Sequence, residues 1–67
     1  MSMMVQVSRQ YREGNWSIYN EIVTEWWDEY LSTLGEDFDS NNADHVENGT
    51  AFIQSKYGDS ASVRLMI

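Results

Sequence analysis

The chain has no cysteine among its 67 residues. This absence excludes a disulfide framework, a thiolate metal site and a cysteine nucleophile. The chain also has a single histidine, His45, whereas transition-metal sites in proteins need several histidine or cysteine ligands. We therefore expect no metal site, and we expect His45 to lie at the surface.

Long apolar runs and catalytic motifs are missing as well. No run approaches the roughly 20 apolar residues of a membrane span, and the apolar residues 1–7 are too few for a signal peptide. No Gly-x-Ser-x-Gly motif surrounds a serine, and the four glycines stand singly, so no glycine-rich loop could hold a phosphate. We expect a soluble, cytoplasmic protein that is not an enzyme and binds no cofactor.

Lysine and arginine are scarce, with four residues against eleven aspartates and glutamates and a net charge of -7. None lies between Arg12 and Lys56, an interval that holds ten of the eleven carboxylates. Such a field repels nucleic acid and anionic membranes and attracts basic protein surfaces. We therefore expect no direct contact with nucleic acid or with a membrane.

The size and the hydrophobic content indicate one small domain that spans residues 1–67. A chain of this length buries only about 60% of the surface that the unfolded chain exposes. The hydrophobic content of 42%, of which 13% is aromatic, is too high for a disordered acidic tail.

Alternating and helical periods divide the chain into elements. Apolar and polar residues alternate over Met3–Tyr11, which predicts a strand, and residues 12–15 predict a turn. Ser17–Leu34 is predicted as a helix with Ser17 as its N-cap and Gly35 as its C-terminal stop. The predicted apolar face of this helix consists of Tyr19, Ile22, Val23, Trp26, Trp27, Tyr30, Leu31 and Leu34.

The second half of the chain predicts loop and strands. Residues 35–49 are acidic and rich in asparagine, which favours a loop, with a short strand over residues 43–47 before a hairpin turn at Asn48-Gly49. Strands are predicted over Thr50–Tyr57 and Ala61–Ile67, with a turn at Gly58-Asp59. We predict an α+β fold: an antiparallel sheet of three to four strands with one amphipathic helix on one face, in the order β-α-(β)-β-β.

The acidic residues of the predicted helix share a narrow arc. Glu21, Glu25 and Glu29 follow at four-residue steps, a like-charge spacing that costs each helical pair a few tenths of a kcal/mol, and no lysine offsets this loss. One turn of helix rises about 5.4 Å, close to the spacing of phosphates along a nucleic-acid strand. The arc can therefore imitate a row of phosphates, although acidity that serves solubility or a high-salt habitat explains the same residues.

The acidic loop also has the opening of a calcium-binding loop. Asp37, Asp39 and Asn41 match its first positions, but Asn42 replaces the required glycine and Asn48 the required final carboxylate. A solvated loop is the better interpretation.

Two adjacent tryptophans, Trp26 and Trp27, cannot both point to the centre of a core. Either a wide sheet covers both, or Trp27 forms an exposed apolar anchor of the kind found at interaction hot spots. A homodimer contact would use the same residues together with Leu31 and the edge strands.

In charge and size the chain resembles the small acidic inhibitors that bacteriophages direct against host defences, such as restriction-enzyme blockers, the uracil-DNA glycosylase inhibitor and anti-CRISPR proteins. The resemblance implies a non-catalytic inhibitor that occupies a basic, nucleic-acid-binding surface of another protein by charge mimicry. The alternative is a homo-oligomeric structural or accessory domain whose acidity serves only solubility. The residues expected to bind the partner are Glu21, Glu25, Asp28, Glu29, Glu36, Asp37, Asp39 and Trp27.

Overall fold

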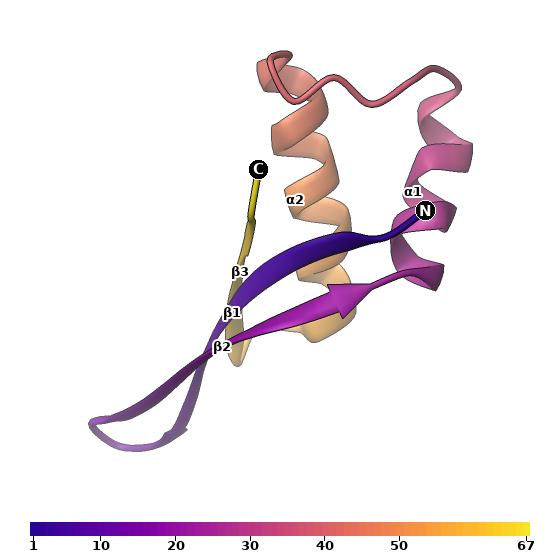
Figure 1. The fold of residues 1–67 in the computed structure, drawn as a ribbon. Helices are drawn as coiled ribbons and strands as arrows, with labels where there is room; N and C mark the ends of the chain where they lie inside the picture. The colour runs from indigo at the N-terminus through magenta and orange to yellow at the C-terminus, as the bar shows by residue number, and fades with distance from the viewer.

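The computed structural model describes residues 1–67 and contains three strands and two helices (Figure 1). Their order is β1 (Met3–Arg12), β2 (Asn15–Val23), α1 (Glu25–Leu34), α2 (Ala43–Tyr57) and β3 (Ala61–Leu65). The predicted α+β class and the three-stranded antiparallel sheet are confirmed. The predicted order and the single helix are wrong, because β2 precedes the first helix and a second helix precedes the last strand.

The sheet has the strand order β2-β1-β3, with both neighbours of β1 antiparallel to it. β1 and β2 form a hairpin around Glu13-Gly14, where Gly14 takes a positive φ of 79° that glycine adopts without steric cost. β3 pairs with the other edge of β1, with Val63 opposite Val7. The predicted first strand, its turn and the final strand are thus confirmed.

The prediction of a helix from Ser17 is wrong over its first half. Residues Asn15–Val23 form β2, and α1 begins only at Glu25. The apolar residues of β2 fit both a helical and a strand period, but isoleucine and valine are stiff at χ1 and favour strands. Pairing with β1 decides the outcome, and Gly35 ends α1 in the left-handed conformation as predicted.

The predicted short strand, the Asn48-Gly49 turn and the strand over Thr50–Tyr57 are also wrong, since these residues form α2. Asn42 caps α2, because its side-chain oxygen accepts hydrogen bonds from the backbone N–H groups of Asp44 and His45 at 3.0 and 3.3 Å. Gly49 lies where α2 crosses α1, and a Cβ there would stand 3.1 Å from the Tyr30 ring and 3.2 Å from the Trp27 ring. Neither helix has the length and hydrophobicity that a membrane span requires.

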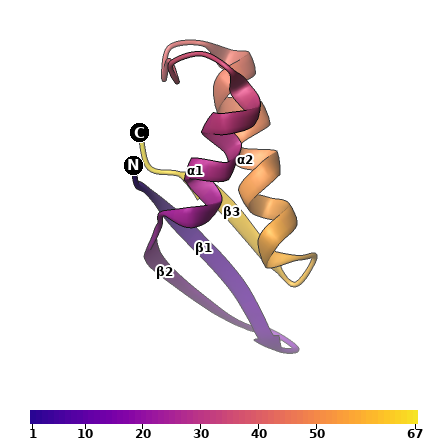
Figure 2. The same cartoon turned by 90° about the vertical axis from the view of Figure 1, so that its right-hand side faces the viewer.

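The two helices cover one face of the sheet, so the molecule has two layers (Figure 2). The layers are offset: the helices extend past one end of the sheet and the β1–β2 hairpin extends past the other, which gives a length of 41 Å against 22 and 17 Å. The core lies where the layers overlap and consists of Val5, Val7, Val23, Trp27, Tyr30, Ile53, Ala61, Val63 and Leu65. We call residues 35–47 the helix end and residues 9–17 the hairpin end.

Candidate protein-binding surfaces

The carboxylates near the start of α1 mostly have partners. The Asp28 carboxylate lies 2.8 Å from the amino group of Met1, and the Glu29 carboxylate lies 3.2 Å from Lys56 Nζ. Glu21, which the helix prediction placed beside them, instead lies on β2 and accepts a hydrogen bond from the Tyr57 hydroxyl. Asp28 and Glu29 are therefore compensated by a cation, whereas Glu21 has only a neutral phenol as its partner and Glu25 has none.

The helix end carries carboxylates of a different kind. None of its five acidic side chains forms an ion pair with a lysine or arginine. Lys56, the only cation on α2, follows Asp44 by twelve residues, about 18 Å of helix, which exceeds the Debye length of about 10 Å at 0.1 M salt. The five are Glu36, Asp37, Asp39, Asp44 and Glu47.

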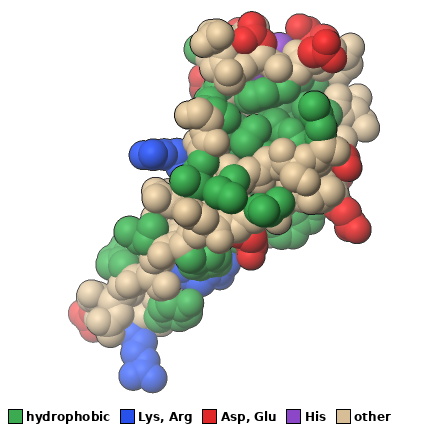
Figure 3. All heavy atoms as spheres, viewed as in Figure 1, with side chains coloured by type: hydrophobic (Ala, Val, Ile, Leu, Met, Phe, Trp, Pro, Cys, Tyr) green, Lys and Arg blue, Asp and Glu red, His purple; other side chains and the backbone are tan.

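The predicted binding residues therefore do not form one patch. They divide between the start of α1 and the helix end, which lie about 15 Å apart along the ten residues of α1. In Figure 3, acidic side chains are visible at the helix end and along the α1 side of the molecule. The uncompensated charge is concentrated at the helix end.

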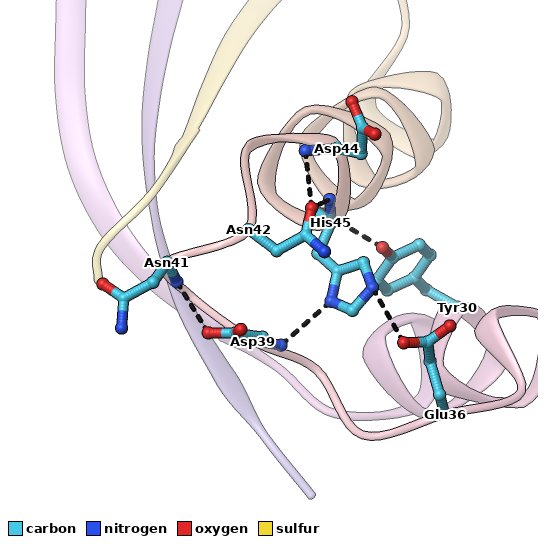
Figure 4. A network of polar contacts seen from close by, with 7 residues as sticks. All are labelled: Tyr30, Glu36, Asp39, Asn41, Asn42, Asp44 and His45. Atoms are coloured by element: carbon cyan, nitrogen blue, oxygen red, sulfur yellow. Dashed lines mark hydrogen bonds and ion pairs between the residues drawn. The ribbon is translucent and has the colours of Figure 1, made fainter.

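A hydrogen-bond network holds the helix end in one conformation (Figure 4). The His45 ring lies at its centre, where Nδ1 accepts a hydrogen bond from the Asp39 backbone N–H at 3.0 Å and Nε2 lies 3.4 Å from Glu36 Oε1. The Tyr30 hydroxyl donates to the His45 carbonyl oxygen at 2.9 Å, and Asp39 Oδ1 accepts from the Asn41 N–H. The loop between the helices is therefore anchored at several points.

His45 does not lie at the surface as predicted, since only 6% of it is exposed. Its Nδ1 accepts a hydrogen bond, so the proton of the neutral ring resides on Nε2, facing Glu36. The ring is thus a structural bridge between the loop and α2. A sequence signal for this role existed in the four-residue spacing of His45, Gly49 and Ile53, which are the buried residues of α2.

Trp27 belongs to the core, with 2% exposed, and its ring centroid lies 5.0 Å from that of Phe38 and 5.1 Å from that of Tyr30. Almost all of its surface is therefore closed to a partner, and the structure favours the interpretation that the core covers it. Trp26 is half-buried and packs edge-on against Tyr57, with the two ring centroids 5.3 Å apart.

The structure contains no group of three or more histidine, aspartate or glutamate side chains close enough to hold a metal ion. In the segment that opens like a calcium loop, Asp39 is hydrogen-bonded within the loop, and Asn42, which stands in place of the required glycine, caps α2.

Tyr57 joins the two layers near the hairpin. Its phenol is partly buried, and burial together with the hydrogen bond to Glu21 raises the pKa of Tyr57 above the ordinary value of 10.0. The Arg9 guanidinium lies over its ring at 5.9 Å. Burial likewise raises the pKa of Tyr30.

The sheet face away from the helices is uncovered and carries large apolar side chains among polar ones, a feature that the sequence prediction missed. Strand alternation and register place five large side chains there, each between 39 and 64% exposed. They are Met4, Trp16, Ile18, Ile22 and Met66. We call this surface the open sheet face. It faces the viewer in Figure 3, and the only carboxylate within a strand, Glu21, points to the helix side.

In comparisons with known proteins, no protein-family model, no curated protein and no solved structure matches the chain.

Proposed function

We propose that the chain is a non-catalytic binding module whose helix end occupies a basic, nucleic-acid-binding surface of another protein. The observation that carries the proposal is the set of five carboxylates of the helix end, held on an anchored loop and the first turns of α2 without an ion pair to lysine or arginine. The mechanism is steric and electrostatic competition with the nucleic acid.

The physical advantage of this arrangement is preorganisation. Because the loop is anchored through His45 and Asn42, its backbone loses little conformational entropy when a partner binds. The N-terminus of α2 offsets only about half of one charge, so the helix end keeps most of its negative potential. Complementary charge of this kind raises the association rate and makes binding sensitive to salt.

The test is affinity capture of basic proteins from a lysate of the source cells, at low and then at moderate salt. We expect a retained basic protein that is released as the salt concentration rises. Two charge-reversal pairs locate the contact: Asp37→Lys with Asp44→Lys at the helix end, and Glu25→Lys with Glu29→Lys on α1.

Reversal at the helix end should weaken capture more than reversal on α1, because most α1 carboxylates are already compensated. Circular dichroism of each variant serves as the control that the fold is kept. Equal capture by the wild type and by both variants would show that the acidity does not serve partner binding and would leave solubility as its role.

A further inference from the structure

The open sheet face and the hollow beside the helix end lie on the same side of the molecule. The hollow has a volume of about 700 Å³, and its apolar lining comes from Met1, Met3, Trp27, Leu31 and Phe38. In Figure 3, hydrophobic side chains appear both in this upper region and along the strands below it. Large apolar side chains are therefore spread along most of the length of this side, with polar strand residues between them.

From this surface we infer that the chain forms a two-fold symmetric homodimer through the open sheet faces, with the long axes of the two copies antiparallel. Each hairpin end lies over the hollow beside the partner's helix end. The sheets pack face to face, about 10 Å apart, and the helices form the outer layers.

The available area comes close to what a stable dimer needs. The five large side chains of the open sheet face expose roughly 500 Å² of apolar surface, taking a fully exposed large side chain as roughly 200 Å². This value lies at the upper end for a monomer, whose largest apolar patch is typically about 300–600 Å². With the hollow and the polar residues of the strands, the surface approaches the 800 Å² or so that each partner contributes to a standard interface.

The distribution of charge selects a second copy of this acidic chain as the occupant. Two chains of net charge -7 repel each other, and this repulsion is weakest where the contact surface carries few carboxylates; the strand residues of the open sheet face contain none. Arg64, which pairs with Gln6, also lies on the open sheet face. Because β3 is an edge strand, the long Arg64 side chain can extend to the rim of the interface and keep its charge in water.

Charge also selects the antiparallel orientation. The hairpin end has a net charge of +1 from Arg9 and Arg12 against Glu13, whereas the helix end has five carboxylates. An antiparallel dimer places Arg12 of each copy near Glu36 and Asp37 of the other, at the mouth of the hollow. A parallel dimer would instead bring the two acidic ends together.

The first test is the mass of the purified chain by sedimentation equilibrium over a wide concentration range. We expect twice the 7.8 kDa of one chain. Ile18 is 64% exposed on the edge strand β2 and lies within the interface, so Ile18→Lys places one cation of each copy against the partner's sheet. This substitution should raise the dimer dissociation constant at least about tenfold, whereas the control Ala51→Lys, on the exposed side of α2, should leave it unchanged. Both variants should keep the wild-type circular dichroism.

The orientation is tested by a charge exchange. Arg12→Asp and Asp37→Arg should each weaken the dimer, and the double variant should recover much of the lost affinity, because it restores opposite charges across the interface. Absence of recovery would overturn the antiparallel arrangement. A monomer at every concentration, or a dimer that Ile18→Lys does not weaken, would overturn the proposal as a whole.

This inference does not depend on the proposed function, although the two surfaces share Glu36 and Asp37. Ile18→Lys leaves every carboxylate in place, so a monomeric variant that still captures the basic partner shows that capture does not require the dimer. A dimer that captures no basic protein would equally leave the dimer standing and remove the proposed function.

Discussion

Replacement of Gly49 by alanine tests the close packing of α2 against α1. Two opposing effects determine the result. Alanine favours a helix interior over glycine by about 1 kcal/mol. Its Cβ, however, would lie 3.1–3.3 Å from the rings of Tyr30 and Trp27, which are 4 and 2% exposed and have little room to move. Overpacking of such a core typically costs about 1–3 kcal/mol.

We therefore expect Gly49→Ala to lower the free energy of unfolding by about 0–2 kcal/mol despite the gain in helix propensity. For a domain of this size each 1 kcal/mol changes the melting temperature by about 4–8 °C. The measurement is thermal and urea unfolding followed by circular dichroism at 222 nm, the wavelength at which helix is monitored.

The control is Ala51→Gly on the exposed side of the same helix, two residues further along. It should cost about 1 kcal/mol, the helix-propensity difference alone. If Gly49→Ala stabilises the protein by as much as Ala51→Gly destabilises it, the two helices do not approach each other as described. Gly49→Leu should then also be tolerated, whereas close packing predicts a severe loss of stability.

Two further predictions concern single side chains. Because the folded-state pKa of Tyr57 is raised above 10.0, the folded chain retains a proton that the unfolded chain loses, so the contribution of Tyr57 to stability should be fully present below pH 10 and fall as the pH rises above it. Tyr57→Phe should flatten this alkaline decline in urea titrations at several pH values, whereas Tyr11→Phe, at a 66% exposed position, should not; an unchanged slope for Tyr57→Phe would contradict the assignment. Asn42→Ala should cost about 0.5–2 kcal/mol through loss of the α2 cap, and Asn42→Asp should cost much less because it keeps the acceptor oxygen. Equal melting temperatures for Asn42→Ala and the wild type would show that the cap contributes nothing.

The elements that were predicted correctly are those whose structure follows from the pattern of neighbouring residues. Alternation over β1 and β3 and the glycine turn at Gly14 are properties of neighbouring residues, and each folds as expected. The C-terminal half of the predicted helix succeeded for the same reason, since its apolar stripe and Gly35 define α1 without tertiary help.

The errors occur where tertiary contact overrides local preference. Residues 17–23 carry an apolar spacing that suits either a helix or a strand, and only the hairpin pairing with β1 resolves it. Asn48-Gly49 is the favoured dipeptide of a hairpin turn, yet Gly49 is present because two rings of α1 leave no space for a side chain. No pattern within α2 reveals that contact.

The candidate surfaces divide in the same way. Sequence locates every carboxylate but not its partner, so it could not distinguish the compensated Asp28 and Glu29 from the uncompensated residues of the helix end. The open sheet face was missed because Ile18 and Ile22 had been assigned to a helix. Once β2 is recognised, their alternation with Tyr19 and Glu21 places them on the uncovered side.

The position of β1 in the middle of the sheet has a consequence for the order of folding. Its first neighbour, β2, is contiguous along the chain and can pair with it quickly, because closing a short hairpin loop costs little entropy. Its second neighbour, β3, comes almost fifty residues after the end of β1, and Val63 and Leu65 complete the core only then. Docking of this last strand should therefore limit the folding rate, and the hairpin whose two edges are both unpaired should be the species that is most prone to aggregate before it.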